Sequence, residues 1–137
     1  MKANQMSPIS TVVMVLSSPL GAGSNANALR FCQAWIDQGH VLPLVFFYGD
    51  GVYTANNLPE TTQGECDLFM HWQQWLRTHH INAVACIASS LKRGLFDEQE
   101  QQRYQKQANN VAEGFRLGGL GDWVEASRQA DKTMVFG

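Results

Sequence analysis

The chain has 137 residues, of which 45% are apolar and 16% are charged, and its formal net charge is −2. This length suits one domain with one hydrophobic core, and the slight negative charge argues against a basic surface that would bind nucleic acid tightly. The three cysteines are an odd number without a CxxC pair, so they indicate neither a disulfide framework nor a zinc finger. A reducing, cytoplasmic location fits this cysteine usage.

The first third of the chain predicts a loose end, a strand and a helix. Residues 1–10 are polar and are expected to form a flexible N-terminus before a single domain over residues 11–137. β-Branched residues over 11–17 predict the first strand. Lys2 and the glycines at 21 and 23 loosely resemble the ends of a signal peptide, but the apolar run is too short to span a membrane and works as a strand. A helix should follow to about residue 38, with Cys32 on its apolar stripe and therefore in the core.

The middle of the chain continues the alternation of strand and helix. A nearly continuous apolar run over residues 41–48 predicts the second strand, followed by a turn at 49–51 and a helical turn over 52–57. A second helix is expected over residues 67–79, with Cys66 just before it as a boundary residue.

Residues 81–94 are the stretch around which the chain is organised. They begin as a short apolar run, typical of a buried strand in a parallel sheet. Ser89 and Ser90 are then expected to cap a short basic turn that ends at Gly94. Cys86 would therefore lie where a strand gives way to a helix start, at the sheet edge where binding and catalysis collect in open α/β folds.

That position favours a reactive thiol at Cys86. The thiolate is the nucleophile, and amides at a helix start together with nearby cations favour it. Lys92 and Arg93 are close enough in sequence to contribute. The pattern alone leaves open that Cys86 is a small buried hydrophobic residue, because cysteine is among the most buried residue types.

The last third completes an α/β pattern. Asp97 with Glu100 predicts a capping box that opens a polar, solvated helix to about residue 107. A short apolar stripe over 108–115 is closed by glycines at 118 and 119, and a helix over 120–130 and a strand over 132–136 follow. The sequence thus predicts a single α/β domain with a mostly parallel sheet of about five strands and helices on both faces.

Two other patterns in the sequence are candidate sites. The glycines at 21 and 23 with Ala26 make a partial dinucleotide fingerprint, but the expected acid is missing and an ordinary turn explains them. Cys66, His71, His79 and His80 have no spacing typical of zinc. We therefore expect no cofactor and no metal.

Three segments resemble a known family. In chain order, residues 46–56, 83–94 and 114–121 resemble the second strand with its loop, the active-cysteine segment and the C-terminal glycine loop of the DsrE/TusD sulfurtransferase family. The resemblance runs from about residue 11 to 136 and is greatest to the TusD branch, so it also implies a DsrE-like fold.

The resemblance implies a function. Cys86 would carry a persulfide and relay its sulfur from a donor to an acceptor protein, toward 2-thiouridine at the tRNA wobble position, with Ser89, Ser90, Lys92 and Arg93 in supporting roles. It implies TusB- and TusC-like sister subunits in a heterohexamer, a TusA-like donor and a TusE-like acceptor. A Dsr-type carrier of sulfur oxidation, a non-catalytic partner subunit and a small nucleotide-binding module remain open.

The aromatic residues give a separate hint of assembly. Aromatic side chains are enriched at protein interfaces, where charge is depleted. The alternative is that they form the core. The residues concerned are Trp35, Phe46, Phe47, Tyr48, Tyr53, Trp72, Trp75 and Trp123.

Overall fold

One parallel sheet forms the centre of the molecule. The computed structural model describes residues 7–137, so most of the expected flexible N-terminus lies outside the described residues. The strands pair in the order β4-β3-β2-β1-β5, and every pair is parallel. The strands are β1 (Ser10–Val15), β2 (Val41–Phe47), β3 (Ala83–Cys86), β4 (Phe115–Gly118) and β5 (Lys132–Phe136).

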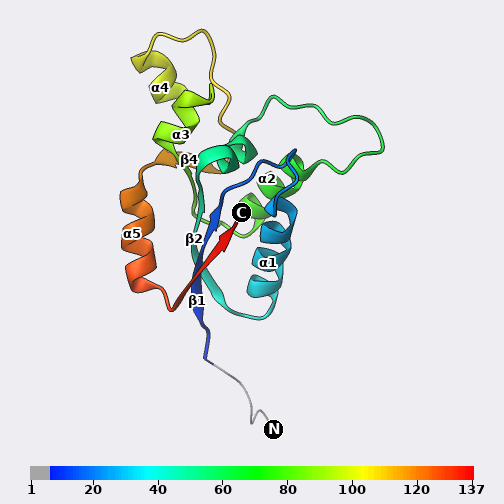
Figure 1. Cartoon of the computed structure of the whole chain (residues 1–137), viewed down its shortest axis with the longest axis vertical. Helices are drawn as coiled ribbons and strands as arrows, with labels where there is room; N and C mark the ends of the chain where they lie inside the picture. Colours follow the sequence, from blue (N-terminus) through cyan, green and yellow to red (C-terminus); the bar gives the residue numbers. More distant parts are fainter. Residues whose placement is uncertain (1–6) are drawn as a thin grey trace.

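Helices cover both faces of this sheet, which confirms the predicted fold class. Helices α1 (Asn25–Asp37) and α2 (Leu68–Thr78) lie on one side and α5 (Leu120–Gln129) on the other (Figure 1). Two consecutive residues of β2 show the two layers, since successive strand side chains point to opposite faces. The Phe46 ring lies 6.2 Å from the Trp123 ring of α5, and the Phe47 ring lies 5.2 Å from the Trp72 ring of α2.

The core explains why the inner strands read as apolar runs. Residues 44–47 of β2 and all four residues of β3 are buried, because a parallel sheet packed on both faces has no polar side. Cys32 of α1 is fully buried in this core, as its place on the apolar stripe predicted. Among the described residues, no helix combines the length and the apolar character needed to cross a membrane.

The connections that leave the carboxyl ends of the strands gather at one edge of the sheet. The 3-10 helix η1 (Gly49–Ala55) follows β2, and the short helix α3 (Ile87–Lys92) follows β3. Helix η1 packs against both β3 and α3. In Figure 1 this edge lies at the top of the sheet, below α3 and α4 (Glu98–Arg103).

The predicted cap of the central helix is wrong. Helix α3 starts at Ile87, directly after β3, and its N-cap is Cys86. Ser89 and Ser90 lie inside the helix and are buried. The strand passes into the helix without a loop, so no separate capping residue stands between them.

The stripe over residues 108–115 belongs to a loop that leads into β4. Val111 forms an isolated antiparallel bridge with Asn56, and the Ala112 amide donates to the Ala55 carbonyl at 2.7 Å. The apolar residues of this segment therefore cover the end of η1. Phe115 then begins β4, a strand that the sequence pattern did not reveal.

The helix after Asp97 is mostly exposed, as predicted, but it is shorter than expected and one of its acids is buried. Asp97 caps α4, and its Oδ1 accepts from the Glu100 amide at 2.8 Å, which confirms the predicted helix start. The helix ends at Arg103. Glu100 is only 4% exposed, with Arg103 Nη1 3.7 Å from its carboxylate, so the expectation that this acid is solvated is wrong.

Candidate functional site

Cys86 occupies the position that the sequence predicted for it. It is the last residue of β3, at the carboxyl edge of the sheet, and it is in register with Gly118 of β4. The residue is 4% exposed. As the N-cap of α3 it makes no side-chain capping hydrogen bond, so the thiol is not tied to an amide of the first helical turn.

The two serines after Cys86 have different surroundings. Ser89 Oγ accepts a hydrogen bond from the Gly49 amide at 3.0 Å, which links α3 to η1. Ser90 is fully buried, and its Oγ has no hydrogen-bond partner in the structure. A buried hydroxyl without a partner costs about 1–3 kcal/mol, so it calls for an explanation.

The two cationic residues of the predicted site, Lys92 and Arg93, have different surroundings. Arg93 Nε donates to Asp50 Oδ1 at 2.9 Å, and Arg93 Nη1 donates to the Ser89 carbonyl at 3.1 Å. Lys92 lies in the last turn of α3 and is exposed. Sequence reasoning did not single out Asp50, because an acid in a glycine turn reads as an ordinary turn residue.

Gly118 brings the glycine loop directly beside the cysteine. A Cβ atom at Gly118 would lie 2.8 Å from Val84 Cγ1, which is too close for a packed side chain. Just beyond it, Asp122 Oδ2 accepts from the Gly119 amide at 3.1 Å and closes the first turn of α5. The loop is thus shaped by packing and capping.

The other two cysteines lie in unlike environments. Burial raises the pKa of the Cys32 thiol from its ordinary value of 9.0 to about 12, so this thiol stays protonated at neutral pH. Cys66 is exposed, and its Sγ lies 3.6 Å from His71 Nδ1. No group of three His, Cys, Asp or Glu side chains among residues 7–137 is arranged to hold a metal ion.

Comparison with known proteins places the fold and this cysteine segment in a family. Residues 10–136 match the DsrE/DsrF-like family. The chain belongs to the DsrE/DsrF-like family. It is 37% identical over 131 residues to a protein of Photorhabdus laumondii named sulfurtransferase TusD, a match that covers 96% of this chain and all of that protein.

A solved structure supports the fold of this DsrE/DsrF-like protein. The crystal structure of the YchN protein from E. coli is similar, with a TM-score of 0.73 and 21% sequence identity. The match covers 93% of this chain and 99% of that chain. At this identity the likeness concerns the fold.

In this DsrE/DsrF-like chain, the partial dinucleotide fingerprint leads into helix α1, whose first turn is packed against the rest of the protein. Asn25, the first residue of α1, is 2% exposed. Its Nδ2 donates to the Ser17 carbonyl at 2.8 Å and to Thr54 Oγ1 at 3.0 Å, and its Oδ1 accepts from Trp72 Nε1 at 2.7 Å. These bonds join the start of α1 to the loop after β1, to η1 and to α2, which accounts for the turn without a nucleotide.

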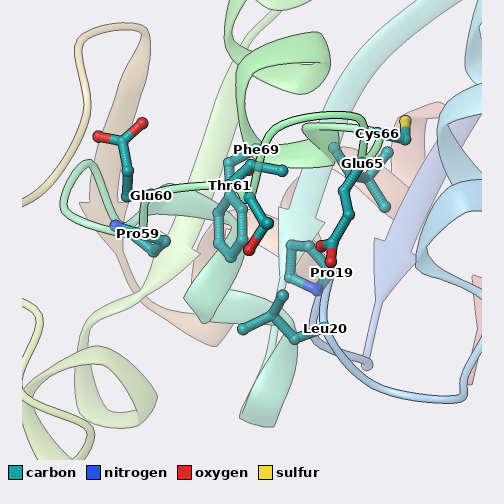
Figure 2. Close-up of a pocket in the computed structure, with 10 residues that line it drawn as sticks. Pro19, Leu20, Pro59, Glu60, Thr61, Glu65, Cys66 and Phe69 are labelled. Atoms are coloured by element: carbon teal, nitrogen blue, oxygen red, sulfur yellow. The ribbon is translucent and has the colours of Figure 1, made fainter.

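The structure also has a small cleft (Figure 2). It has a volume of about 110 Å³ and lies where the loop after β1 meets the segment before α2. Cys66 is among its lining residues and Cys86 is not. Leu20, Pro59 and Phe69 give it an apolar wall, while Glu60 and Glu65 stand at its margin.

Proposed function

We propose that this chain is a sulfurtransferase that carries a persulfide on Cys86 and passes its terminal sulfur to an acceptor thiol. The observation that carries the proposal is the 37% identity, over nearly the whole of both chains, to a protein named sulfurtransferase TusD. The position of Cys86 at the carboxyl edge of the sheet supports it, because binding and catalysis collect at that edge in open α/β folds.

The proposed reaction is two successive exchanges at sulfur. The Cys86 thiolate attacks the terminal sulfur of a donor persulfide, so a Cys86 S–S bond forms while the donor S–S bond breaks and the donor leaves as a thiolate. An acceptor thiolate then attacks the terminal sulfur on Cys86, and Cys86 returns to the thiolate. No net oxidation or reduction occurs, and no cofactor is needed.

The neighbouring hydroxyls are suited to support the sulfur anion. A serine hydroxyl has one proton to donate and two acceptor positions. Ser89 Oγ accepts from Gly49, so its proton remains available, and Ser90 Oγ has no partner at all. We assign Ser90 as the main supporting donor. Ser90→Ala should shorten the lifetime of the Cys86 persulfide, and an unchanged decay rate of that persulfide would remove this role.

The pathway and the assembly are the finer parts of the proposal. We extend the proposal to transfer toward 2-thiouridine in tRNA, in a heterohexamer with TusB- and TusC-like sister subunits, which is what the resemblance to the TusD branch implies. The donor would be TusA-like and the acceptor TusE-like. Because the net charge is −2, the acceptor protein, and not this chain, would meet the tRNA.

Mass spectrometry of the chain after incubation with a persulfide donor tests the proposal. The peptide that contains Cys86 should gain the mass of one sulfur atom, and a thiol reductant should remove it. The peptides that contain Cys32 and Cys66 are the internal controls. No added sulfur on Cys86 would contradict the proposal and favour a non-catalytic partner subunit.

A further inference from the structure

The Cys86 thiol is covered, although transfer between two proteins requires a second sulfur atom to reach it. Only 4% of Cys86 is exposed. Helix η1 packs against β3, the strand that Cys86 ends, and against α3, the helix that Cys86 caps. It is therefore the candidate for an element that covers the thiol.

Two hydrogen bonds join η1 to α3 and its C-cap residue Arg93, and a third bond within the α3 segment holds the Arg93 side chain in place. The Gly49 amide donates to Ser89 Oγ at 3.0 Å. Arg93 Nε donates to Asp50 Oδ1 at 2.9 Å, and Arg93 Nη1 donates to the Ser89 carbonyl at 3.1 Å. The ion pair between Asp50 and Arg93 is called here the Asp50–Arg93 clasp. Of the three bonds, it is the one that joins two side chains.

We propose that the Asp50–Arg93 clasp controls access to Cys86, with Asp50 acting through Arg93 as a positioning residue. When the clasp is closed, η1 covers the thiol. When it opens, the Gly49–Asp50 end of η1 moves away and another sulfur atom can approach. The purpose of this control rests on the proposed function, but access to the thiol can be measured without any sulfur transfer.

The clasp is weak enough to open. The Asp50 side chain is 65% exposed and that of Arg93 is 23% exposed. An ion pair in contact with water shifts an equilibrium by only about 1.5- to 5-fold, and salt screens it. A partner protein with an acidic segment could therefore displace Asp50 from Arg93 at little cost.

The backbone beside the clasp has open space next to Gly49, while much of the rest of η1 is buried. Gly49 has φ +57°, and no atom lies within 4 Å of the place where its Cβ would be. Further along, Val52, Thr54 and Ala55 are fully buried. Opening at Gly49 and Asp50 would thus leave the core of the protein in place.

The test is the alkylation rate of Cys86 in the full chain, mapped to each cysteine by peptide mass spectrometry. Asp50→Asn and Arg93→Gln both break the clasp but change the local charge in opposite directions. Control of access predicts that both variants are alkylated about two- to fivefold faster than the parent, with the larger gain for a bulky maleimide than for iodoacetamide. A purely electrostatic effect on the thiol predicts one faster and one slower variant.

Three controls sharpen this experiment. Asp50→Glu keeps the carboxylate and should restore the parent rate. Glu125→Gln breaks an exposed ion pair with Arg128 on α5, where Nη1 and Oε2 lie 2.9 Å apart, and should leave the rate unchanged. Cys32 reports unfolding, because it is fully buried and should stay unlabelled.

The parent protein gives a second measurement that does not depend on any variant. Added sodium chloride should speed Cys86 alkylation in the parent and have no such effect in Asp50→Asn, because the salt screens only an existing pair. Unchanged rates in both clasp variants, changes of opposite sign, or a parent rate that is insensitive to salt would each overturn the proposal.

Discussion

At the scale of single residues, the two buried cysteines lie in different surroundings. Cys32 lies on α1 with core side chains around it, and its thiol pKa is raised to about 12 by burial. Cys86 is almost as buried, yet it lies at the end of a strand, at the carboxyl edge of the sheet and in register with Gly118. Place in the fold, and not burial, is therefore the observation on which we propose Cys86 as the reactive cysteine.

Cys32 should make stability depend on pH in the alkaline range. Its folded-state pKa of about 12 lies above the ordinary value of 9.0, so the unfolded chain loses this proton first as the pH rises. The stabilisation that this pKa shift provides is complete below pH 9.0 and is lost between pH 9.0 and about 12. Over that range the free energy of unfolding falls by up to about 1.4 kcal/mol per pH unit.

Urea unfolding of the parent and of Cys32→Ala at increasing alkaline pH measures this effect. The variant has a constant cost from its cavity, so the slopes of the two curves are compared and not their heights. The parent should lose stability more steeply. Parallel curves would show that Cys32 does not titrate as described.

At the scale of elements, β4 and its glycine loop depend on the absence of a side chain at Gly118. Gly118→Ala would place a Cβ atom against Asp122 Oδ2 and 2.8 Å from Val84 Cγ1, and it should destabilise the fold by about 1–3 kcal/mol. Gly121→Ala is the matched control, because nothing lies within 4 Å of that position and alanine favours a helix. It should be neutral or stabilise the protein by up to about 1 kcal/mol. Equal stabilities of the two variants, measured by urea unfolding, would contradict this account of the loop.

The elements with a strong apolar pattern were predictable from the sequence. Strand β5 has the bounds that the pattern predicted, and α2 begins and ends within one residue of its expected range. Strand β4 could not be predicted, because four residues with an arginine and a glycine show no periodicity. The N-cap of α3 was predicted wrongly because serines usually signal a helix start, whereas here Cys86, the last residue of the strand, is the N-cap.

At the scale of the whole molecule, half of the aromatic residues that hinted at an interface lie in the core. Phe46, Phe47, Trp72 and Trp75 are buried, and the other four are half-buried. The apolar side chains exposed on α5 and β5 are aliphatic or methionine. They are Leu120, Val124, Met134 and Val135.

These exposed residues lead to a prediction about assembly. Strand β5 is an edge of the sheet, and exposed edges and apolar patches favour association. Expressed alone, the chain should self-associate or be poorly soluble, and co-expressed TusB- and TusC-like subunits should relieve this. Light scattering checks it, and a stable monomer at high concentration whose mass does not change with those subunits would be the contrary result.

The candidate site was only partly predictable. The position of Cys86 at a strand end followed from local pattern, because an apolar run and a helix signal are both short-range features. The pairing of Cys86 with Gly118 and the contact of Asp50 with Arg93 join residues that are 32 and 43 positions apart. Such contacts follow from the order of strands in the sheet, which a single sequence does not state.

The measurement that tests the central claim most directly is sulfur transfer from a labelled persulfide donor to an acceptor thiol, carried out with variants in which one cysteine at a time is replaced. Cys86→Ser should abolish transfer. Cys66→Ala and Cys32→Ala, each verified as folded by circular dichroism, should retain it. Transfer that survives in Cys86→Ser, or that is lost in a folded Cys66→Ala or Cys32→Ala variant, would contradict the assignment of Cys86 as the sulfur carrier.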